Sequence, residues 1–338
     1  MKDKASLRLT SAEMSVLWTQ YVNDSLAVCV TSYFLQKVED EEIRPIIQEV
    51  IEITTQNLSL LTTLFKQENF PIPVGFTKED VNINAPRLYS DQFVLMYLQN
   101  MSLLAMTASS LALGLVTRPD IVSFFKRILK AAVLVQDKTR EQLLQQGIYV
   151  KPPFISTPKE VSFVEKQSFM GGIFGGNRAL TAPEITFLFS NIRTNAVGKV
   201  LIIGFGQTAR DKEVRHYFLK GKEMATKHLN IFQDILTKED VPAPMMWDSV
   251  VTNSTTPVFS DKLMMYHISA MTAAGIGNYG TSMAGSQRKD LAVRYASLIP
   301  EVALFAEEGA TIMIKNKWLE EPPQADDRKQ LIERKEQG

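Results

Sequence analysis

The sequence predicts an all-α protein built from two tandem ferritin-like four-helix bundles, each with one long crossover, packed as a pseudo-two-fold pair. Three observations predict it. Apolar residues recur at helical spacing through most of the chain, two long windows lack formal charge, and the first half of the chain recurs in the second. The windows run from Gln92 to Thr117 and from Leu263 to Gln287. Uncharged windows at matched positions indicate a duplicated domain whose least polar helix occurs twice.

The duplication is seen in residues that recur at a constant offset. Leu9-Thr10 and Glu13 recur as Leu180-Thr181 and Glu184, an offset of 171 residues (from 9 to 180). One residue is lost farther along, and the offset becomes 170. A period of this length indicates duplication of a whole domain, because solenoid repeats span only about 20 to 50 residues. Further matched pairs are Asp40 and Asp211, Pro71 and Pro242, Pro73 and Pro244, Ser90 and Ser260, and Asp120 and Asp290.

Within each repeat, the order of helices and loops predicts the connectivity of the bundle. Thr10 and Glu13 form a capping-box pattern at the start of the first helix. After Pro71 no helical pattern returns until Ser90, which predicts a long crossover. The third helix is the uncharged window, and the fourth begins near Pro119, a residue suited to a first helical turn. A short loop, a long crossover and a short loop are typical of ferritin-like bundles.

The repeats divide the chain into four predicted regions. The bundles cover residues 8–148 and 180–319, an ordered connector covers 149–179, and a charged tail covers 320–338. Order is expected in the connector because large apolar side chains such as Phe163 are costly to leave in water.

The distribution of charge predicts how the two bundles meet. In both repeats the first and third helices are poor in charge, whereas the second and fourth carry most of it. A helix that is apolar all round is expected to be covered on more than one side, so we expect the bundles to pack through their first and third helices. Small residues also predict close approach of another helix, because glycine costs about 1 kcal/mol against alanine in a helix interior, although sequence drift explains them as well. One helix has a row of small residues and its partner has three glycines: Ser269, Ala273, Gly277, Thr281 and Gly285, and Gly198, Gly204 and Gly206.

Composition excludes several classes of function. The 338 residues include 37 basic and 37 acidic side chains, and without a basic excess nucleic acid is not an expected partner. The single cysteine, Cys29, excludes an internal disulfide and a multi-cysteine zinc site. Met1 to Arg8 holds no apolar segment of the kind that a secretory signal needs, so we expect a cytoplasmic protein.

The uncharged windows are long enough to cross a bilayer, which takes about 20 residues. Each window also holds polar side chains, such as Gln99 and Asn100 in the first and His267 and Asn278 in the second. Polar residues are costly in lipid. We therefore expect helices buried in protein and no membrane span.

A ferritin-like fold raises the question of a di-iron or di-manganese centre. Such a centre takes a Glu from each of two helices and a Glu-x-x-His motif from each of the other two. Glu213 and His216 have the required spacing, and Glu307 is a further candidate ligand in the second bundle. Against a metal site, the third helices contain no carboxylate beyond their first turn. The pattern predicts no cofactor and no catalytic or cofactor-binding residue, and these three residues are kept only as an alternative.

His267 is an unusual polar residue for the uncharged window that contains it. We expect it to be buried and hydrogen-bonded, or to face a ligand. The methionines near it allow a further alternative, an apolar ligand held between the bundles, although a Met-rich stripe is usually core. The methionines concerned are Met264, Met265, Met271 and Met283.

The chain resembles an uncharacterised family of spore-forming Gram-positive bacteria in three features. These are the duplicated helix starts, the Pro-Ile-Pro and Pro-Ala-Pro entries to the crossovers, and the connector from Phe163 to Arg178 with its Gly-Gly pairs. The chain is similar, more distantly, to the spore coat protein F group. The resemblance covers roughly residues 8 to 325. It implies two ferritin-like bundles and an association with sporulation or the spore coat, and it supplies no catalytic residues.

These observations favour a non-enzymatic structural or interaction protein associated with the forespore, spore or spore coat. Further copies of the chain or coat proteins are its expected partners. One alternative is a metal-dependent oxidoreductase with a degenerate site around Glu213, His216 and Glu307. The other is the binding of an apolar ligand between the bundles.

Overall fold

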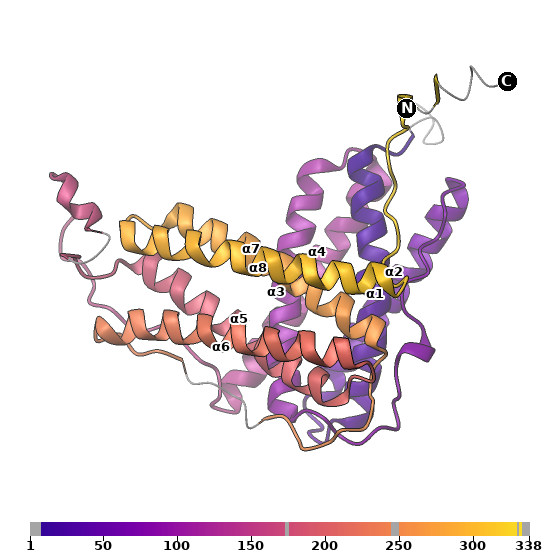
Figure 1. The fold of residues 1–338 in the computed structure, drawn as a ribbon, viewed down its shortest axis with the longest axis horizontal. Coiled ribbons are helices and arrows are strands. Elements are labelled where there is room, and N and C mark those ends of the chain that lie inside the picture. Colours follow the sequence, from indigo (N-terminus) through magenta and orange to yellow (C-terminus); the bar gives the residue numbers. More distant parts are fainter. Residues whose placement is uncertain (1–7, 173–175, 245–249, 330, 333–338) are drawn as a thin grey trace.

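The fold is all-helical, as predicted. The computed structural model describes residues 8–172, 176–244, 250–329 and 331–332, and over these residues eight long helices follow one another in two groups of four (Figure 1). The first group comprises α1 (Ser11–Lys37), α2 (Arg44–Gln67), α3 (Asp91–Leu115) and α4 (Pro119–Gln145). The second comprises α5 (Ala182–Thr208), α6 (Lys212–Lys238), α7 (Asp261–Gly285) and α8 (Lys289–Lys315). Short 3-10 turns, η2 (Lys78–Asp80) and η3 (Gln167–Met170), lie in the connections.

Each group forms a four-helix bundle with one long crossover, between its second and third helices. In Figure 1 the helices of the first bundle stand upright and those of the second run across them. The two uncharged windows became α3 and α7. None of the described helices is both long and apolar enough to cross a membrane.

One buried carboxylate ties two helices together at the end of the first bundle. Glu13 accepts hydrogen bonds from the backbone amides of Thr10 (2.8 Å), Thr117 (3.0 Å) and Arg118 (2.9 Å). It therefore caps α1 and holds the start of α4 at the same time. Burial alone would raise the pKa of Glu13, but these amides outweigh it and lower the pKa to about 2.

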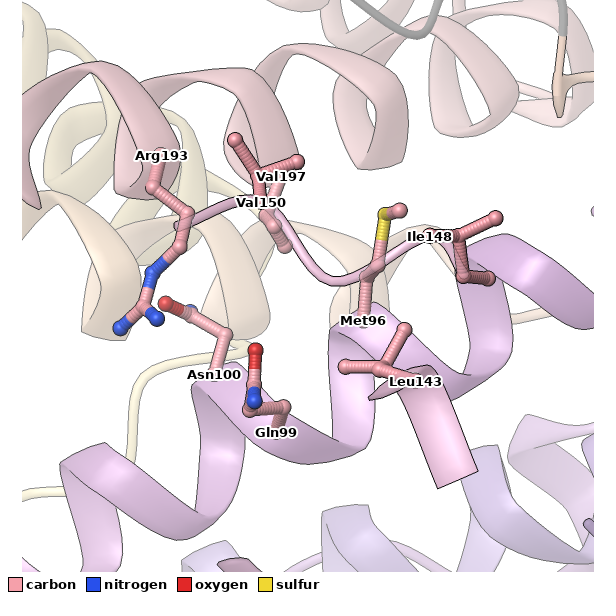
Figure 2. A pocket seen from close by; sticks show the side chains of 8 residues that line it. All are labelled: Met96, Gln99, Asn100, Leu143, Ile148, Val150, Arg193 and Val197. Carbon is pink, nitrogen blue, oxygen red and sulfur yellow. The ribbon is translucent and has the colours of Figure 1, made fainter. Parts of the chain in front are cut away.

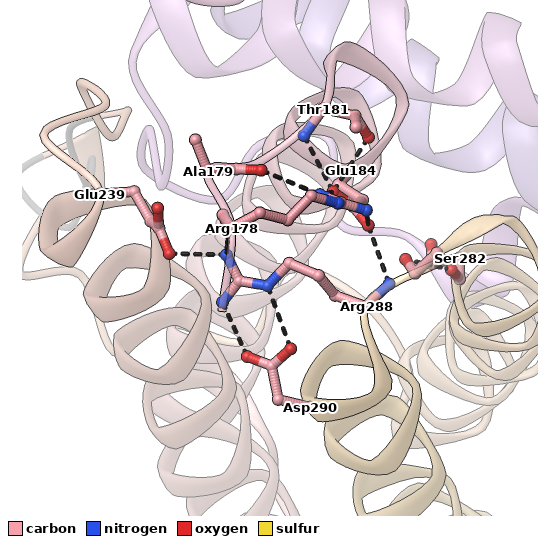
Figure 3. A network of polar contacts seen from close by, with 9 residues as sticks. Arg178, Ala179, Thr181, Glu184, Glu239, Ser282, Arg288 and Asp290 are labelled. Carbon is pink, nitrogen blue, oxygen red and sulfur yellow. Dashed lines mark hydrogen bonds and ion pairs between the residues drawn. The ribbon is translucent and has the colours of Figure 1, made fainter. Parts of the chain in front are cut away.

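The second bundle is closed in the same way (Figure 3). Glu184 accepts from the amides of Thr181 (2.8 Å) and Arg288 (3.0 Å). The Arg288 guanidinium pairs in turn with Glu239 at 2.6 Å and with Asp290 at 2.8 Å. The duplication thus extends from the helices to the hydrogen bonds that join them.

The two crossovers pair with each other across the pseudo-two-fold axis. Val81 and Phe259 form an antiparallel bridge, as do Tyr89 and Val251. The offset of 170 residues maps one bridge onto the other. The flanking backbone hydrogen bonds repeat likewise: Asn82 N to Val258 O (2.7 Å), Thr252 N to Leu88 O (2.9 Å), Ser90 N to Val250 O (2.9 Å) and Ser260 N to Asp80 O (2.9 Å). This symmetric pairing confirms the predicted pseudo-two-fold arrangement.

The largest apolar core runs through both bundles. Tyr33 of α1 packs edge to face on Phe259, with 5.4 Å between ring centroids. The hydroxyl of Tyr89 donates to the carbonyl of Leu201 in α5 at 2.8 Å. Phe259 and Tyr89 belong to the crossovers just before α7 and α3, and within those helices the Tyr97 hydroxyl contacts the imidazole of His267. The first and third helices of the repeats therefore meet in the interior, as the charge pattern predicted.

Close packing explains Gly204, one of the glycines at which the sequence predicts close approach. A Cβ at Gly204 would lie 2.3 Å from the Tyr89 hydroxyl oxygen, so only glycine leaves room for that ring. The equivalent residue in the first repeat is Tyr33, so a large residue faces a small one across the axis. The prediction for Gly277 is wrong, because no atom lies within 4 Å of a Cβ placed there.

The connector differs from its prediction in burial. Phe154, Val161 and Phe163 are 92%, 87% and 87% exposed. The expectation that water would force such side chains inward is therefore wrong for these three residues. Residues 173–175 of the connector and 333–338 of the tail lie outside the described residues.

Candidate functional site

A cavity of about 90 Å³, partly open to the surface, lies among the helices of the second bundle. All four helices of the bundle line it, and three glycines, Gly198, Gly221 and Gly275, contribute no side chain to its wall. Much of the rest of the wall is apolar: Ile202, Met224, Ile268, Met271, Val302 and Phe305. The cavity lies where a four-helix bundle builds a ligand or metal site, in its core between facing helices.

One wall of the cavity is a buried polar network centred on His228 and Tyr279. The Nδ1 atom of His228 lies 2.9 Å from the Tyr279 hydroxyl, and its Nε2 atom lies 3.2 Å from a carboxylate oxygen of Glu301. Asn195 donates from Nδ2 to the same hydroxyl at 3.0 Å. Both ring nitrogens of the histidine are therefore engaged by the protein itself.

Burial governs the charge of this network. It lowers the pKa of His228, and the carboxylate of Glu301 offsets this only in part. Burial likewise raises the pKa of the Tyr279 hydroxyl. At neutral pH the wall consists of a neutral imidazole and a neutral phenol, which can orient a polar group but carry no net charge.

The first bundle has different polar residues at the same place. By the duplication offsets the equivalent residues are Asp24 for Asn195, Asn57 for His228 and Ser109 for Tyr279. Asp24 is fully enclosed, and its Oδ2 atom has no hydrogen-bond partner. Burial raises the pKa of Asp24 to about 7, although hydrogen bonds with Gln20 and Asn57 oppose the shift. The two bundle centres are both polar, but their chemistry differs.

Neither centre has the donor set of a dinuclear metal site, which combines four carboxylates with two histidines. The polar groups at the first centre include one carboxylate, Asp24, and those at the second include His228 and Glu301. Across the described parts of the chain, no three His, Cys, Asp or Glu side chains come close enough together to hold an ion. The residues present therefore do not fit a di-iron or di-manganese group.

The three metal candidates from the sequence lie on the outside of the second bundle. Glu213, near the start of α6, pairs with the Nζ atom of Lys315 at 2.7 Å, and both side chains are exposed. His216 and Glu307 are exposed as well. The structure does not bring these residues together as a ligand set.

His228 is a polar residue of the site that the sequence analysis did not single out, because it lies beside Lys227 in a polar stretch of the sequence. The position of His228 along the helix nevertheless indicates that it is buried. His228 lies seven residues after Gly221 and four before Phe232, both buried, so all three share one helix face. Alignment of the repeats also pairs it with Asn57, which is buried too.

His267 is buried and hydrogen-bonded, in agreement with one of its two predicted roles. It is 3% exposed, and its Nε2 atom lies 3.2 Å from the Tyr97 hydroxyl. Tyr97 occupies the position in the first repeat that His267 occupies in the second. This contact therefore lies on the pseudo-two-fold axis. Burial lowers the pKa of His267 to about 3, and its Nδ1 atom has no partner.

The four methionines near His267 do not share one site. Met264 and Met265 are completely buried in the core that joins the bundles. Met283 packs at the edge of the second core cluster. Met271 lines the cavity, which lies within the second bundle and not between the bundles.

Comparisons with known proteins bear on the family. No curated protein matches the chain in sequence. The chain is similar to a solved structure from Bacillus halodurans C-125, a protein provisionally named a spore coat protein, with 17% identity and a TM-score of 0.41 over 46% of this chain and 100% of that one. The model of the family DUF3231, described as proteins of unknown function, matches residues 2–161 and again residues 168–331. Because each repeat matches the family model and the two matches span nearly the whole chain, this protein belongs to the DUF3231 family.

Proposed function

We propose that this protein is a non-enzymatic structural or interaction protein that contacts another protein through its connector. The observation that carries the proposal is a group of exposed apolar side chains in the connector. They are Phe154, Ile155, Val161, Phe163 and Val164. Burial of one large apolar side chain contributes about 1.5–3 kcal/mol, and clustered exposed apolar residues are typical of protein interaction sites.

The architecture supports the same proposal. The crossovers and the shared core join two bundles into one body, with the connector on its outside. Among the described residues, the bundle centres lack the donor set of a dinuclear metal site, so no set of ligands there supports the di-iron or di-manganese alternative. The sequence resemblance to proteins of spore-forming bacteria supports a place in the forespore, spore or spore coat.

The test is a variant that removes the connector's aromatic side chains. We expect Phe154→Ser with Phe163→Ser to abolish self-association in sedimentation velocity, or to abolish retention of a coat protein on the immobilised chain. Leu304→Ser is the matched control, because Leu304 is an exposed apolar residue of α8 outside the connector. If the double variant behaves like the wild type in both assays, the proposal is wrong.

A second candidate function is the binding of a small apolar molecule in the second bundle. It rests on the cavity of about 90 Å³ with its apolar wall and its His228–Tyr279 network. A larger apolar cavity, of about 150 Å³, binds benzene or xenon. We expect a xenon site beside Met271 in pressurised crystals, and its loss in Gly275→Leu, whose side chain would point into the cavity. Crystals without xenon at this position would exclude the candidate.

A further inference from the structure

A smaller cavity, of about 20 Å³, lies where the two bundles meet (Figure 2). Gln99 and Asn100 of α3 and Arg193 of α5 line it, together with the apolar side chains of Met96, Leu143 and Val197. The chain that follows α4 completes the wall. Both repeats therefore contribute to the cavity.

The polar atoms on this wall are incompletely satisfied. Four buried atoms have no hydrogen-bond partner: Gln99 Nε2, Asn100 Nδ2, Asn100 Oδ1 and Arg193 Nε. Gln99 and Asn100 are only 5% and 3% exposed. Figure 2 shows the Arg193 and Asn100 side chains reaching toward each other, with Gln99 beside them. A buried polar group without a partner costs about 1–3 kcal/mol, so a bound group that pairs with these atoms would be stabilising.

The unpaired atoms favour a negatively charged group. Three of the four are hydrogen-bond donors, and one of the three belongs to a guanidinium, which stays charged in proteins. Among the described residues Arg193 forms no ion pair with a carboxylate. Burial lowers its pKa, and the nearby phenol of Tyr149 opposes this shift only in part. A half-buried positive charge without a counter-charge is costly.

The fold itself does not require this polarity, because the duplication provides a second copy of the same position. There Val22 stands for Arg193, Ser269 for Gln99 and Ala270 for Asn100. Trp318, the equivalent of Ile148 beside the cavity, packs against the shared core. One side of the pseudo-two-fold axis thus has a valine, a serine, an alanine and a tryptophan, while the other has an arginine, two amides and a space.

We propose that this cavity binds one small, singly charged anion, held by the guanidinium of Arg193 and the amide groups of Gln99 and Asn100. A single water requires roughly 10–15 Å³ of such space, so about 20 Å³ accommodates a halide or one carboxylate group and not a larger oxyanion. The anion neutralises Arg193 and links α3 of the first bundle to α5 of the second.

The first test locates the anion in crystals of the full chain grown without halide and then soaked in sodium bromide. We expect an anomalous bromide peak within hydrogen-bonding distance of Arg193 and Asn100. A competing soak with formate distinguishes the two sources of charge. If formate removes the bromide peak, the site binds a carboxylate group as well as a halide. If the bromide peak persists in formate, the site is a halide site. Crystals with only water in the cavity would overturn the proposal.

The second test measures the same binding in solution. Bromide at ten times its dissociation constant should raise the thermal unfolding midpoint by about 2 °C over sodium sulfate at equal ionic strength. We expect Arg193→Met to remove this rise, and the surface variant Arg140→Met to keep it. An anomalous peak without a rise in the wild type means binding at crystal concentration only, and overturns the proposal. If Arg193→Met does not fold, Arg193→Lys replaces it, because lysine keeps the charge but loses the two-pronged geometry.

Discussion

At the scale of single residues, the pseudo-two-fold axis is marked by two side chains that occupy one position in the duplicated sequence. Tyr97 and His267 contact each other there, and each is flanked by an equivalent phenylalanine, Phe34 or Phe205. The enclosure is complete enough to keep His267 neutral. The neutral form is maintained only while the chain is folded, which makes stability depend on pH.

We predict that His267 destabilises the fold in acid. In the unfolded chain it takes up a proton near pH 6.5, whereas in the folded chain its pKa is about 3. Between these values the unfolded state binds more protons, so the free energy of unfolding falls as the pH is lowered, by at most about 1.4 kcal/mol per pH unit. We expect His267→Gln to flatten this dependence in urea unfolding from pH 7 to pH 4. The exposed His216→Gln should leave it unchanged, and equal slopes in all three proteins would contradict the prediction.

Asp24 should act in the opposite direction. Its pKa is raised from 3.8 to about 7, so the folded chain holds a proton that the unfolded chain releases. Its favourable contribution is complete below pH 3.8 and is lost as the pH rises through 7. We expect Asp24→Asn to be more stable than the wild type at pH 8 and nearly equal to it at pH 4, as measured by urea midpoints. Asp137→Asn, at a partly exposed site in an ion pair with Arg140, is the control. A gain that is the same at both pH values would refute the assignment.

At the scale of helices, glycine has two different roles in the second repeat. In α5, Gly204 leaves room for Tyr89 from the other repeat, whose hydroxyl is hydrogen-bonded to Leu201 in the same helix. In α7, Gly277 faces open space. Sequence alone assigned both to close packing, because both are glycines within charge-poor helices.

A matched pair of alanine substitutions distinguishes these roles. Gly204→Ala should destabilise by about 1–3 kcal/mol, because the added methyl group meets a rigid ring that is itself held in place. Gly277→Ala should stabilise by up to about 1 kcal/mol, since the helix gains propensity and nothing is displaced. Denaturant titrations of the two variants measure both effects. If both substitutions changed the free energy of unfolding in the same direction, packing at Gly204 would not be what determines the stability of Gly204→Ala.

At the scale of the whole molecule, the repeats are duplicated but not independent. The apolar core that joins them includes residues from both bundles, and each crossover finds its backbone partners in the other. A single bundle would expose the Tyr33, Tyr89 and Tyr97 side chains that the partner bundle covers. Removal of one repeat therefore removes part of the core of the other.

We predict that the first repeat, expressed as residues 8–148, does not persist as a folded monomer. Its exposed face is half of a pseudo-symmetric interface, so it should either self-associate through that face or lose cooperative unfolding. Sedimentation equilibrium and circular dichroism measure these outcomes. The intact chain should unfold in one calorimetric transition. A stable, cooperatively unfolding monomer of the first repeat would contradict the prediction.

The residues also show how far the sequence could lead toward the candidate sites. The buried state of His267 was predicted because it interrupts a long apolar window. The roles of His228 and Arg193 were not, because each lies among polar or charged neighbours in sequence, and only the helix face and the packed partner bundle enclose them. Glu213 and His216 have ligand spacing along one helix, yet their side chains point to solvent. The spacing of residues along a helix shows which side chains lie next to each other on that helix. It does not show whether those side chains face another helix or solvent.

The sequence by itself determined the helices, their order, the duplication and the pairing of charge-poor faces. Helical periodicity depends on residues close together in the chain, and a duplication is found by comparing the chain with itself. The tertiary structure decided what lies between those faces. It placed Tyr97 against His267 on the axis, paired the crossovers, left Phe163 in solvent and left Arg193 half-buried, with no counter-charge among the described residues. The physical reason is that burial and electrostatics depend on groups brought together from distant parts of the chain, here about 100 to 170 residues apart.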